Sequence, residues 1–234
     1  MRSYSEAVVL IPAYNEEKNI EKVVKLTKKY VKGAKVVVVD DGSKDKTSKL
    51  AKKAGATVIV HKKNKGKGEA LNTGFSFILK KLKSIKYVVL IDADLQFHPR
   101  DAKSVMAPLI ADEADFVMGN RDWSKVPLRH RLGNILWRIT FNLLFGTRLK
   151  DTNCGMISMN KKALKAVGRV YGGYIIDNQL IINCLKRGLK VTNAPVTVYY
   201  KHVSKVPRGV RMVLGVWVFL VKKGIRYRLG LEKA

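Results

Sequence analysis

Two aspartates one residue apart, Asp92 and Asp94, follow an apolar run in the stretch LIDADLQFHP. Paired carboxylates repel each other unless a cation or a proton lies between them. In an extended stretch both side chains would point to the same side, where one divalent cation can bind both. Mg²⁺ and Mn²⁺ prefer such oxygen ligands and often share them with phosphate oxygens. Gln96 continues the two-residue spacing, so its carbonyl oxygen is a candidate third ligand. A lone Asp-x-Asp is also common in solvated turns, so its place in the fold must decide between a metal site and such a turn.

Polar residues follow two earlier apolar runs as well. In the stretch PAYNE, Tyr14 offers a ring and Glu16 an acceptor to a base or a ribose. Asn15 or its neighbour is alternatively the N-cap of the next helix. In the stretch DDGS, one aspartate is a candidate to accept a hydrogen bond from the base or the ribose of a nucleotide. Ser43 would cap the helix that follows.

The stretch NKGKGEA places lysines and glycines at the start of a predicted helix. It lacks the spacing of a P-loop, which argues against a kinase or an ATPase. The stretch therefore predicts close backbone approach to a phosphorylated ligand or, alternatively, a flexible turn.

Apolar runs alternate with amphipathic helical stretches over the first half of the chain. This pattern predicts an α/β fold with a mixed, mostly parallel sheet that carries helices on both faces. The ligand crevice of such a sheet lies at the carboxyl ends of its strands, which is where the polar residues occur. The predicted strands cover residues 7–14, 34–43, 56–61, 87–94 and 115–121.

Two later helices are strongly apolar and flanked by basic residues. The stretch 129–148 has a leucine and isoleucine stripe on one face and arginines and asparagines on the other. The stretch 211–230 contains ten uncharged residues, 212–221, whereas a membrane span needs roughly 20. Each is therefore either a helix that lies in the membrane interface or an ordinary core helix. We expect residues 1–205 to form the catalytic domain and residues 206–234 a C-terminal interfacial helix.

The composition favours an anionic partner. Lys and Arg number 46 against 18 Asp and Glu, a formal net charge of +28. Such a chain attracts nucleic acid, anionic lipid or phosphorylated substrates. No helix-turn-helix, zinc or RNP signature is present, so nucleic acid is not the expected partner. The two cysteines are too few for a disulfide framework, and no signal peptide is evident, so a cytosolic chain is the default expectation.

Together, the elements PAYNE, DDGS, GKG and DADLQ resemble family 2 nucleotide-sugar glycosyltransferases of the Rossmann-like GT-A fold. Within that family they resemble the polyprenyl-phosphate sugar synthases, typified by dolichol-phosphate mannose synthase. The resemblance covers roughly residues 7–205 and includes the later stretches GNR, DTNCG and YYKHVSKV.

The resemblance implies a role for each matching residue. The nucleotide-binding set would be Pro12, Tyr14, Glu16, Asp41, Lys67 and Asp92. The Mg²⁺ or Mn²⁺ ligands would be Asp92, Asp94 and Gln96. The catalytic residues would be Asp94, Arg121, Arg131 and Asp177. The acceptor phosphate and its loop would involve Arg121, Arg129, Arg131, Ser204 and Lys205.

The implied reaction is an inverting transfer of a hexose or N-acetylhexosamine from a GDP- or UDP-sugar to a polyprenyl (dolichyl) phosphate, on the cytoplasmic face of an anionic membrane. A phosphate monoester has a second pKa near ~6, so it is already a nucleophile at neutral pH. A saccharide hydroxyl acceptor would instead need a general base, for which Asp177 is the candidate. Asp177 is followed by Asn178 and Gln179, a departure from the more acidic family pattern, and is alternatively a helix N-cap.

Overall fold

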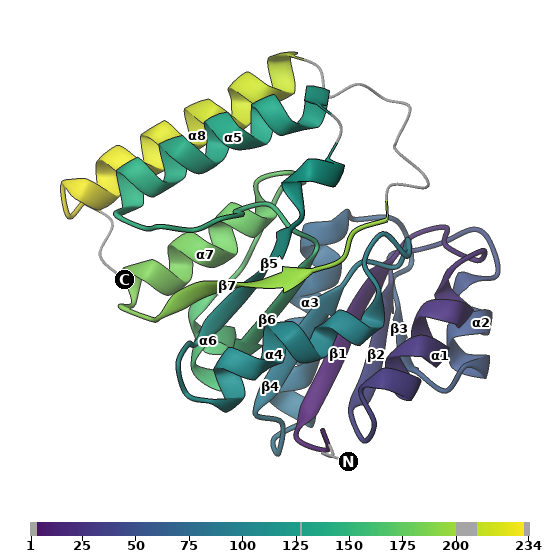
Figure 1. The fold of residues 1–234 in the computed structure, drawn as a ribbon. Helices are drawn as coiled ribbons and strands as arrows, with labels where there is room; N and C mark the ends of the chain where they lie inside the picture. Colours follow the sequence, from purple (N-terminus) through teal and green to yellow (C-terminus); the bar gives the residue numbers. More distant parts are fainter. Residues whose placement is uncertain (1–3, 127, 200–209, 232–234) are drawn as a thin grey trace.

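The computed structural model describes residues 4–126, 128–199 and 210–231, with a seven-stranded mixed sheet at its centre (Figure 1). The strand order is β3-β2-β1-β4-β6-β5-β7, and β6 alone runs antiparallel to its neighbours. The mixed, mostly parallel sheet predicted from the sequence is confirmed. The strands are β1 (Ala7–Ala13), β2 (Lys35–Asp40), β3 (Thr57–Val60), β4 (Tyr87–Ile91), β5 (Phe116–Arg121), β6 (Met156–Asn160) and β7 (Val191–Val196).

Helices cover both faces of the sheet. The helices α1 and α4 lie on one face, and α3 lies on the other beside α6 and α7 (Figure 1). Because both faces are covered, the central strands are apolar throughout, and the valine run of β2 is at most 5% exposed. The helices are α1 (Ile20–Tyr30), α2 (Thr47–Lys53), α3 (Lys67–Lys81), α4 (Ala102–Ile110), α5 (Leu128–Phe145), α6 (Lys161–Ala166), α7 (Ile176–Lys186) and α8 (Val210–Arg228), with short 3₁₀ turns at Pro99–Asp101 and Trp123–Lys125.

The strands β6 and β7 were not among the five predicted. The strand β7 carries Asn193 and Pro195, and a proline lowers the strand signal because it cannot donate to the ladder. Its position at the edge of the sheet explains why the proline is tolerated. The strand β6 inserts between β4 and β5 and pairs Ile91 with Met156. This register brings the segment before β6 to the end of β4.

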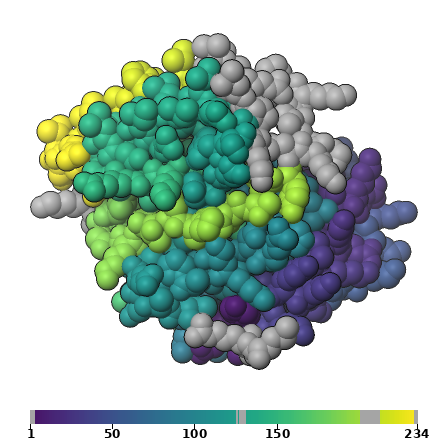
Figure 2. Space-filling view, viewed as in Figure 1, coloured from purple at the N-terminus to yellow at the C-terminus, as the bar shows by residue number. Residues whose placement is uncertain are grey.

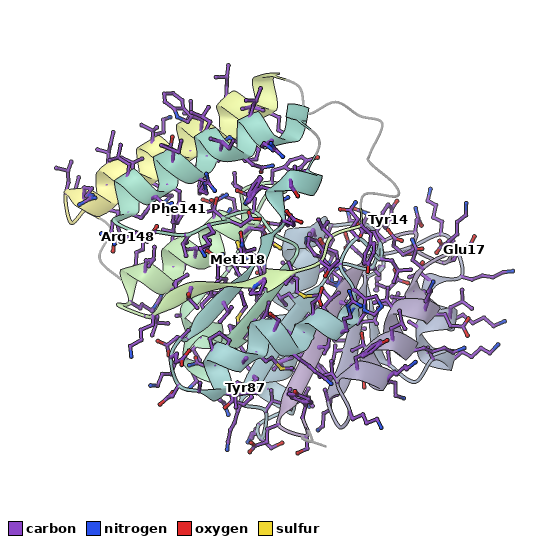
Figure 3. The ribbon with its side chains drawn as sticks, viewed as in Figure 1. Tyr14, Glu17, Tyr87, Met118, Phe141 and Arg148 are labelled. Atoms are coloured by element: carbon purple, nitrogen blue, oxygen red, sulfur yellow. The ribbon has the colours of Figure 1, made fainter. Side chains whose placement is uncertain are left out.

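The carboxyl ends of the parallel strands meet at one end of the sheet. Figure 3 shows Tyr14 there, just after β1, while Tyr87, the first residue of β4, lies at the opposite end. The polar residues that follow β1, β2 and β4 are therefore neighbours in space, as the predicted parallel sheet requires.

The helices α5 and α8 pack side by side and run in the same direction above the sheet (Figure 1). The Trp137 indole, midway along α5, donates to the Val213 carbonyl in the first turn of α8, and the Arg228 guanidinium at the end of α8 donates to the Leu143 and Leu144 carbonyls near the end of α5. No helix within the described ranges is both long enough and apolar enough to cross a bilayer.

The polar face of α5 points inward, toward the sheet. Arg138 donates to the Lys150 carbonyl, and Asn142 bonds both the amide and the carbonyl of Leu149. The aromatic residues Trp137 and Phe141 are buried beneath the helix pair. The leucine and isoleucine stripe predicted from the sequence points outward instead, where Leu132, Leu136, Ile139 and Leu143 are 42–72% exposed.

A buried ion pair joins β5 to the segment before β6. The Arg121 guanidinium donates to both carboxylate oxygens of Asp151 at 2.7 and 2.9 Å, and Asp151 is only 1% exposed. Two guanidinium groups lie close to the Trp123 ring, with the ring centroid 5.1 Å from Arg121 and 5.6 Å from Arg138. This arrangement connects the sheet to α5.

We expect Asp151→Ala to lower the free energy of unfolding by about 3–5 kcal/mol, because it leaves the Arg121 guanidinium buried without its carboxylate. Urea unfolding followed by circular dichroism measures the change. The matched change Glu6→Ala removes one partner of an exposed pair with Lys86 and should leave the unfolding midpoint near that of the wild type. Equal effects of the two changes would contradict the structural role of the buried pair.

Candidate active site

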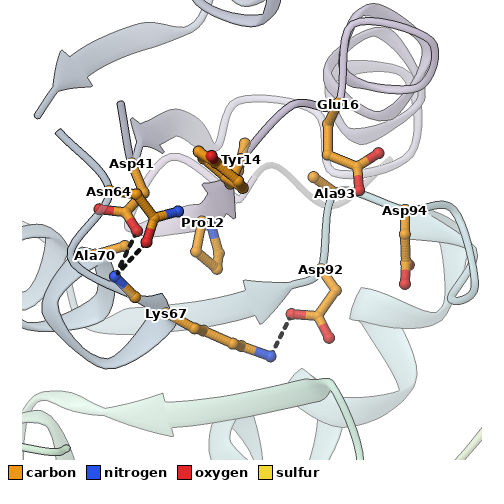
Figure 4. Close-up of a pocket in the computed structure, with 12 residues that line it drawn as sticks. Pro12, Tyr14, Glu16, Asp41, Asn64, Lys67, Ala70, Asp92, Ala93 and Asp94 are labelled. Atoms are coloured by element: carbon orange, nitrogen blue, oxygen red, sulfur yellow. Dashed lines mark hydrogen bonds and ion pairs between the residues drawn. The ribbon is translucent and has the colours of Figure 1, made fainter. Parts of the chain in front are cut away.

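The carboxyl ends of β1, β2 and β4 surround a cavity of ≈ 320 Å³ (Figure 4). Its lining includes every residue of the predicted nucleotide-binding set, together with Asp94. The lining residues are Pro12, Ala13, Tyr14, Glu16, Asp41, Asn64, Gly66, Lys67, Ala70, Asp92, Ala93 and Asp94. Residues from four separate stretches of the sequence thus share one pocket. Their roles in binding stay predictions.

The two aspartates lie on a turn and not on an extended strand. The strand β4 ends at Ile91, and Leu95 has a positive φ of 60°. The Gln96 amide donates to Asp94 Oδ1 at 2.9 Å, which closes the turn. The premise that all three side chains alternate along an extended stretch is therefore wrong. The two carboxylates line the pocket, whereas Gln96 is not among its lining residues.

Lys67, the first residue of α3, neutralises part of this negative charge. Its ammonium lies 2.6 Å from Asp92 Oδ1 (Figure 4). Burial alone would lower the pKa of Lys67, but Asp92, Asp177 and Asp94 together raise it above its ordinary value. Lys67 therefore remains a cation at the centre of the site.

Burial, reinforced by the charge of Asp92, raises the pKa of Asp94 to about 6. Two carboxylates that disfavour each other's ionised form are suited to a shared cation. No group of three or more Asp, Glu, His or Cys side chains in the described part of the chain forms a metal site by itself. Mg²⁺ commonly uses one or two carboxylates and takes its remaining ligands from substrate phosphates and water. Asp92 and Asp94 fit that kind of site.

Gly155 allows the segment before β6 to approach Asp92 closely. A Cβ atom at this position would lie 2.2 Å from Asp92 Oδ2, so no other residue fits without moving the carboxylate. The antiparallel register of β6 creates this contact. Sequence reasoning did not identify Gly155 as a site residue, although the stretch DTNCG that contains it was noted.

Asp177 of α7 interacts electrostatically with the site from far along the chain, but it is not among the residues that line the cavity. Burial raises the pKa of Asp177 to about 6; Lys67 and Arg121 lower it, while Asp92 and Asp151 raise it further. Asp177 lies inside the first turn of α7 and is not its N-cap, so the alternative capping role is wrong.

The predicted acceptor-binding arginines differ in their surroundings. Arg121 is 7% exposed and forms an ion pair with Asp151. This ion pair was not predicted from the sequence. Arg131 donates from Nη2 to the Trp123 carbonyl, and its buried Nε has no hydrogen-bond partner within the described part of the chain. Arg129 belongs to α5, but its side chain is outside the described part of the structure. Ser204 and Lys205 also lie outside the described residues.

The turns after β1 and β2 bind each other directly. Asn15 has a positive φ of 54°, its amide donates to Ser43 Oγ, and its Oδ1 accepts from the Lys44 amide. The helix α1 instead begins after Asn19, and α2 begins after Lys46. The predicted capping roles of Asn15 and Ser43 are therefore wrong, because these side chains join two loops.

The family model for "Glycosyl transferase family 2" matches residues 8–168. A UDP-N-acetylglucosamine–dolichyl-phosphate N-acetylglucosaminyltransferase of Methanococcus voltae is 32% identical and covers 90% of this chain and 92% of its own. An uncharacterized protein of Methanocaldococcus jannaschii is 36% identical, with coverage of 90% and 88%.

Among solved structures, glucosyl-3-phosphoglycerate synthase of Mycobacterium tuberculosis, in complex with Mn²⁺, UDP-glucose and phosphoglyceric acid, superposes with a TM-score of 0.74. Its sequence is 23% identical, and the match covers 93% of this chain and 79% of that one. At this identity the likeness establishes the shared fold.

We expect Asp94→Asn to stabilise the metal-free protein by about 1–2 kcal/mol at pH 8 and by little at pH 4. The folded pKa of about 6 exceeds the ordinary 3.8, so the contribution of Asp94 to stability is complete below pH ~4 and is lost as the pH rises through 6. Urea unfolding with EDTA from pH 4 to 8 measures the difference between variant and wild type.

The control for this measurement is Asp112→Asn, which changes an exposed carboxylate at the end of α4. Its effect on the free energy of unfolding should be nearly constant over the same pH range. A constant difference for Asp94→Asn as well would contradict the raised pKa.

Proposed function

The chain belongs to glycosyl transferase family 2, and from its site we propose that this glycosyltransferase moves a hexose or N-acetylhexosamine from a GDP- or UDP-sugar to a polyprenyl (dolichyl) phosphate with inversion. The observation that carries the proposal is the layer formed by α5 and α8. Arg131 and Arg138 of α5 bond backbone carbonyls on the side of the layer that faces the sheet, while Leu132, Leu136 and Leu143 are exposed on its outer side. Such a layer suits an acceptor with an anionic head and an apolar tail.

In the proposed reaction an acceptor phosphate oxygen attacks the anomeric carbon of the sugar. The bond from that carbon to the diphosphate breaks, and the nucleoside diphosphate leaves with the electron pair. Two anionic groups must therefore approach each other, and Lys67 and Arg131 supply positive charge for this. The Arg131 Nε–H is a buried donor that has no partner among the described residues, and we propose that it serves the acceptor's anionic group. Arg121 adds positive charge while it holds Asp151.

Asp92 and Asp94 would hold Mg²⁺ or Mn²⁺, with Gln96 as a further predicted ligand. The bound metal would stabilise the charge of the departing diphosphate. Without it, Lys67 pairs with Asp92, so a cation at this carboxylate is already part of the site. Pro12, Tyr14, Glu16 and Asp41 would hold the nucleotide in the cavity that they line.

A second candidate reaction uses a saccharide or glycan hydroxyl as acceptor. The raised pKa of Asp177, about 6, favours this candidate, because a general base works best with a pKa near the operating pH. In that reaction Asp177 would take the hydroxyl proton as the oxygen attacks. With a phosphate acceptor no proton has to be removed.

The same layer supports a peripheral membrane location, which we propose on the cytoplasmic face. Residues 123–150 and 178–231 contain no Asp or Glu. The exposed apolar side chains continue from α5 to α8, where Leu214, Val218 and Ile225 are 42–51% exposed. Figure 2 shows α5 and α8 forming one continuous part of the surface. An apolar face with only positive charge around it matches an anionic lipid surface.

We expect the double variant Asp92→Ala, Asp94→Ala to lose transfer of labelled sugar to dolichyl phosphate by at least about 100-fold, because the departing diphosphate loses its metal. The measurement is the organic-extractable label formed with Mn²⁺ and GDP- or UDP-sugars. A double variant that is folded and retains the labelled lipid would contradict the metal assignment.

The variant Asp177→Asn serves as the discriminating control in the same assay. A milder loss supports the phosphate acceptor, while complete loss together with transfer to a saccharide supports the hydroxyl acceptor.

We also expect Leu132→Glu with Leu143→Glu to reduce binding to anionic liposomes by about tenfold or more, because two exposed leucines leave the lipid and two like charges enter. Flotation with phosphatidylserine-containing vesicles measures the bound fraction. The control Val60→Glu changes an apolar residue that is 51% exposed on the edge strand β3 and should leave flotation unchanged. If the double variant floated like the wild type, α5 would be an ordinary helix and not a lipid-binding one.

A further inference from the structure

A second cavity, of ≈ 590 Å³, lies between the edge strand β7 and the segment that follows α5. Its walls are residues 146–150 on one side, residues 191–195 on the other, and Asn120 near the end of β5. Figure 1 shows the segment after α5 crossing beneath that helix and above β7. The cavity shares no lining residue with the one at the ends of β1, β2 and β4. Its volume lies within the range of about 300–1,000 Å³ that small-molecule sites occupy.

Two buried asparagine networks hold the segment after α5 in place. Asn142 of α5 accepts from the Leu149 amide and donates to the Leu149 carbonyl. Asn193 of β7 accepts from the Lys150 amide at 2.7 Å and donates to the Asp151 carbonyl at 2.9 Å. The Leu149 side chain is only 6% exposed. The wall opposite β7 is therefore fixed both to the helix above it and to the strand below it.

The charged side chains of the lining are all positive. Arg148 and Lys150 are both exposed, and neither side chain forms a hydrogen bond or an ion pair with another residue in the described part of the chain. No Asp or Glu lines the cavity. Cations without a carboxylate partner favour an anionic ligand, and the guanidinium group is suited to phosphate because it can donate two parallel N–H bonds.

The uncharged polar groups of the lining favour a ligand with hydroxyl groups. Asn120 Oδ1 is buried and has no donor among the described residues, and a buried acceptor without a donor costs free energy. A ligand hydroxyl would supply that donor. The Thr147 hydroxyl donates to Asn142 Oδ1, which leaves its oxygen able to accept a further hydrogen bond. Since β7 is an edge strand, alternate amides along it also have no strand to bond.

We propose that this cavity is a second ligand site and that it takes a phosphate ester that carries hydroxyl groups. The phosphate would pair with Arg148 and Lys150, and a hydroxyl would donate to Asn120. Two sources supply this chemistry, a free sugar phosphate and the head group of an anionic lipid such as phosphatidylglycerol. The proposal does not depend on which acceptor the transfer reaction uses.

The site adjoins the buried ion pair between Arg121 and Asp151. Asn120 directly precedes Arg121, and Lys150 directly precedes Asp151. Asn193 bonds both backbone groups between which that second junction lies, the Lys150 amide and the Asp151 carbonyl. A ligand bound here would therefore stabilise the native position of the segment that carries Asp151.

Calorimetry with glucose-6-phosphate, inorganic phosphate and glucose tests the site in the whole chain. We expect the wild type to bind glucose-6-phosphate about fivefold more tightly than inorganic phosphate, and glucose without measurable heat. The double variant Arg148→Ala, Lys150→Ala should bind glucose-6-phosphate about tenfold or more weakly, because the charge-assisted contacts are lost. Asn120→Leu should lower the affinity for glucose-6-phosphate to that for inorganic phosphate and leave the latter unchanged.

Two controls separate this cavity from other positive surfaces. Lys52→Ala with Lys53→Ala removes the same charge from the exposed end of α2 and should keep the wild-type affinity. Equal weakening by both double variants would show unspecific attraction and overturn the proposal. Arg131→Ala should also keep the affinity, because Arg131 does not line the cavity. Loss in Arg131→Ala with wild-type binding in the Arg148, Lys150 variant would place the phosphate at the proposed acceptor site instead.

Flotation distinguishes the two sources of the ligand. The vesicles contain zwitterionic lipid with the same fraction of either phosphatidylglycerol or phosphatidylserine. A preference for phosphatidylglycerol that disappears in Arg148→Ala, Lys150→Ala would assign the lipid head group. Equal flotation with both lipids, together with the expected binding of glucose-6-phosphate, would assign the free sugar phosphate. A wild type that neither binds glucose-6-phosphate nor prefers phosphatidylglycerol would overturn the second site.

Discussion

The ion pair between Lys67 and Asp92 is the contact on which the site depends. It joins the first residue of α3 to the end of β4 at 2.6 Å. Asp92 is confined on its other side by Gly155, where no Cβ can be accommodated. Three stretches of the chain therefore meet at one carboxylate. The negative charge of Asp92 would otherwise disfavour this meeting, since it raises the pKa of both Asp94 and Asp177.

Charge compensation also explains how the sheet is connected to the helical layer. Arg121 and Asp151 form a buried pair that fixes the segment leading to Gly155. Arg121 and Arg138 both contact the Trp123 ring, and Arg131 donates to the Trp123 carbonyl. Arg131 and Arg138 of α5 are therefore held inward by specific partners, while Leu132, Leu136 and Leu143 of the same helix face outward. One set of contacts thus orients both the cationic side and the apolar side of the layer.

Several features of the site were accessible from the sequence because they are local. Alternating apolar strands and helices predict a parallel sheet, and parallel strands bring their carboxyl ends together. The sequence therefore sufficed to place five residues in one site: Pro12, Tyr14, Glu16, Asp41 and Asp92. The capping roles of Asn15 and Ser43 failed because both side chains bond a partner about 28 residues away, and local capping patterns do not record such contacts.

The sequence by itself determined the family, the mostly parallel sheet whose strand ends carry the polar residues, and the excess of positive charge. Only the tertiary structure decided that β6 is antiparallel and places Gly155 against Asp92, that α5 turns Arg131 and Arg138 inward, and that Asp41 already accepts from His61, Lys65 and Gly66. The physical reason is the same in each case. The number of free acceptor positions on a carboxylate, or the direction of a helix face, depends on partners far away in the chain, and no pattern of neighbouring residues specifies them.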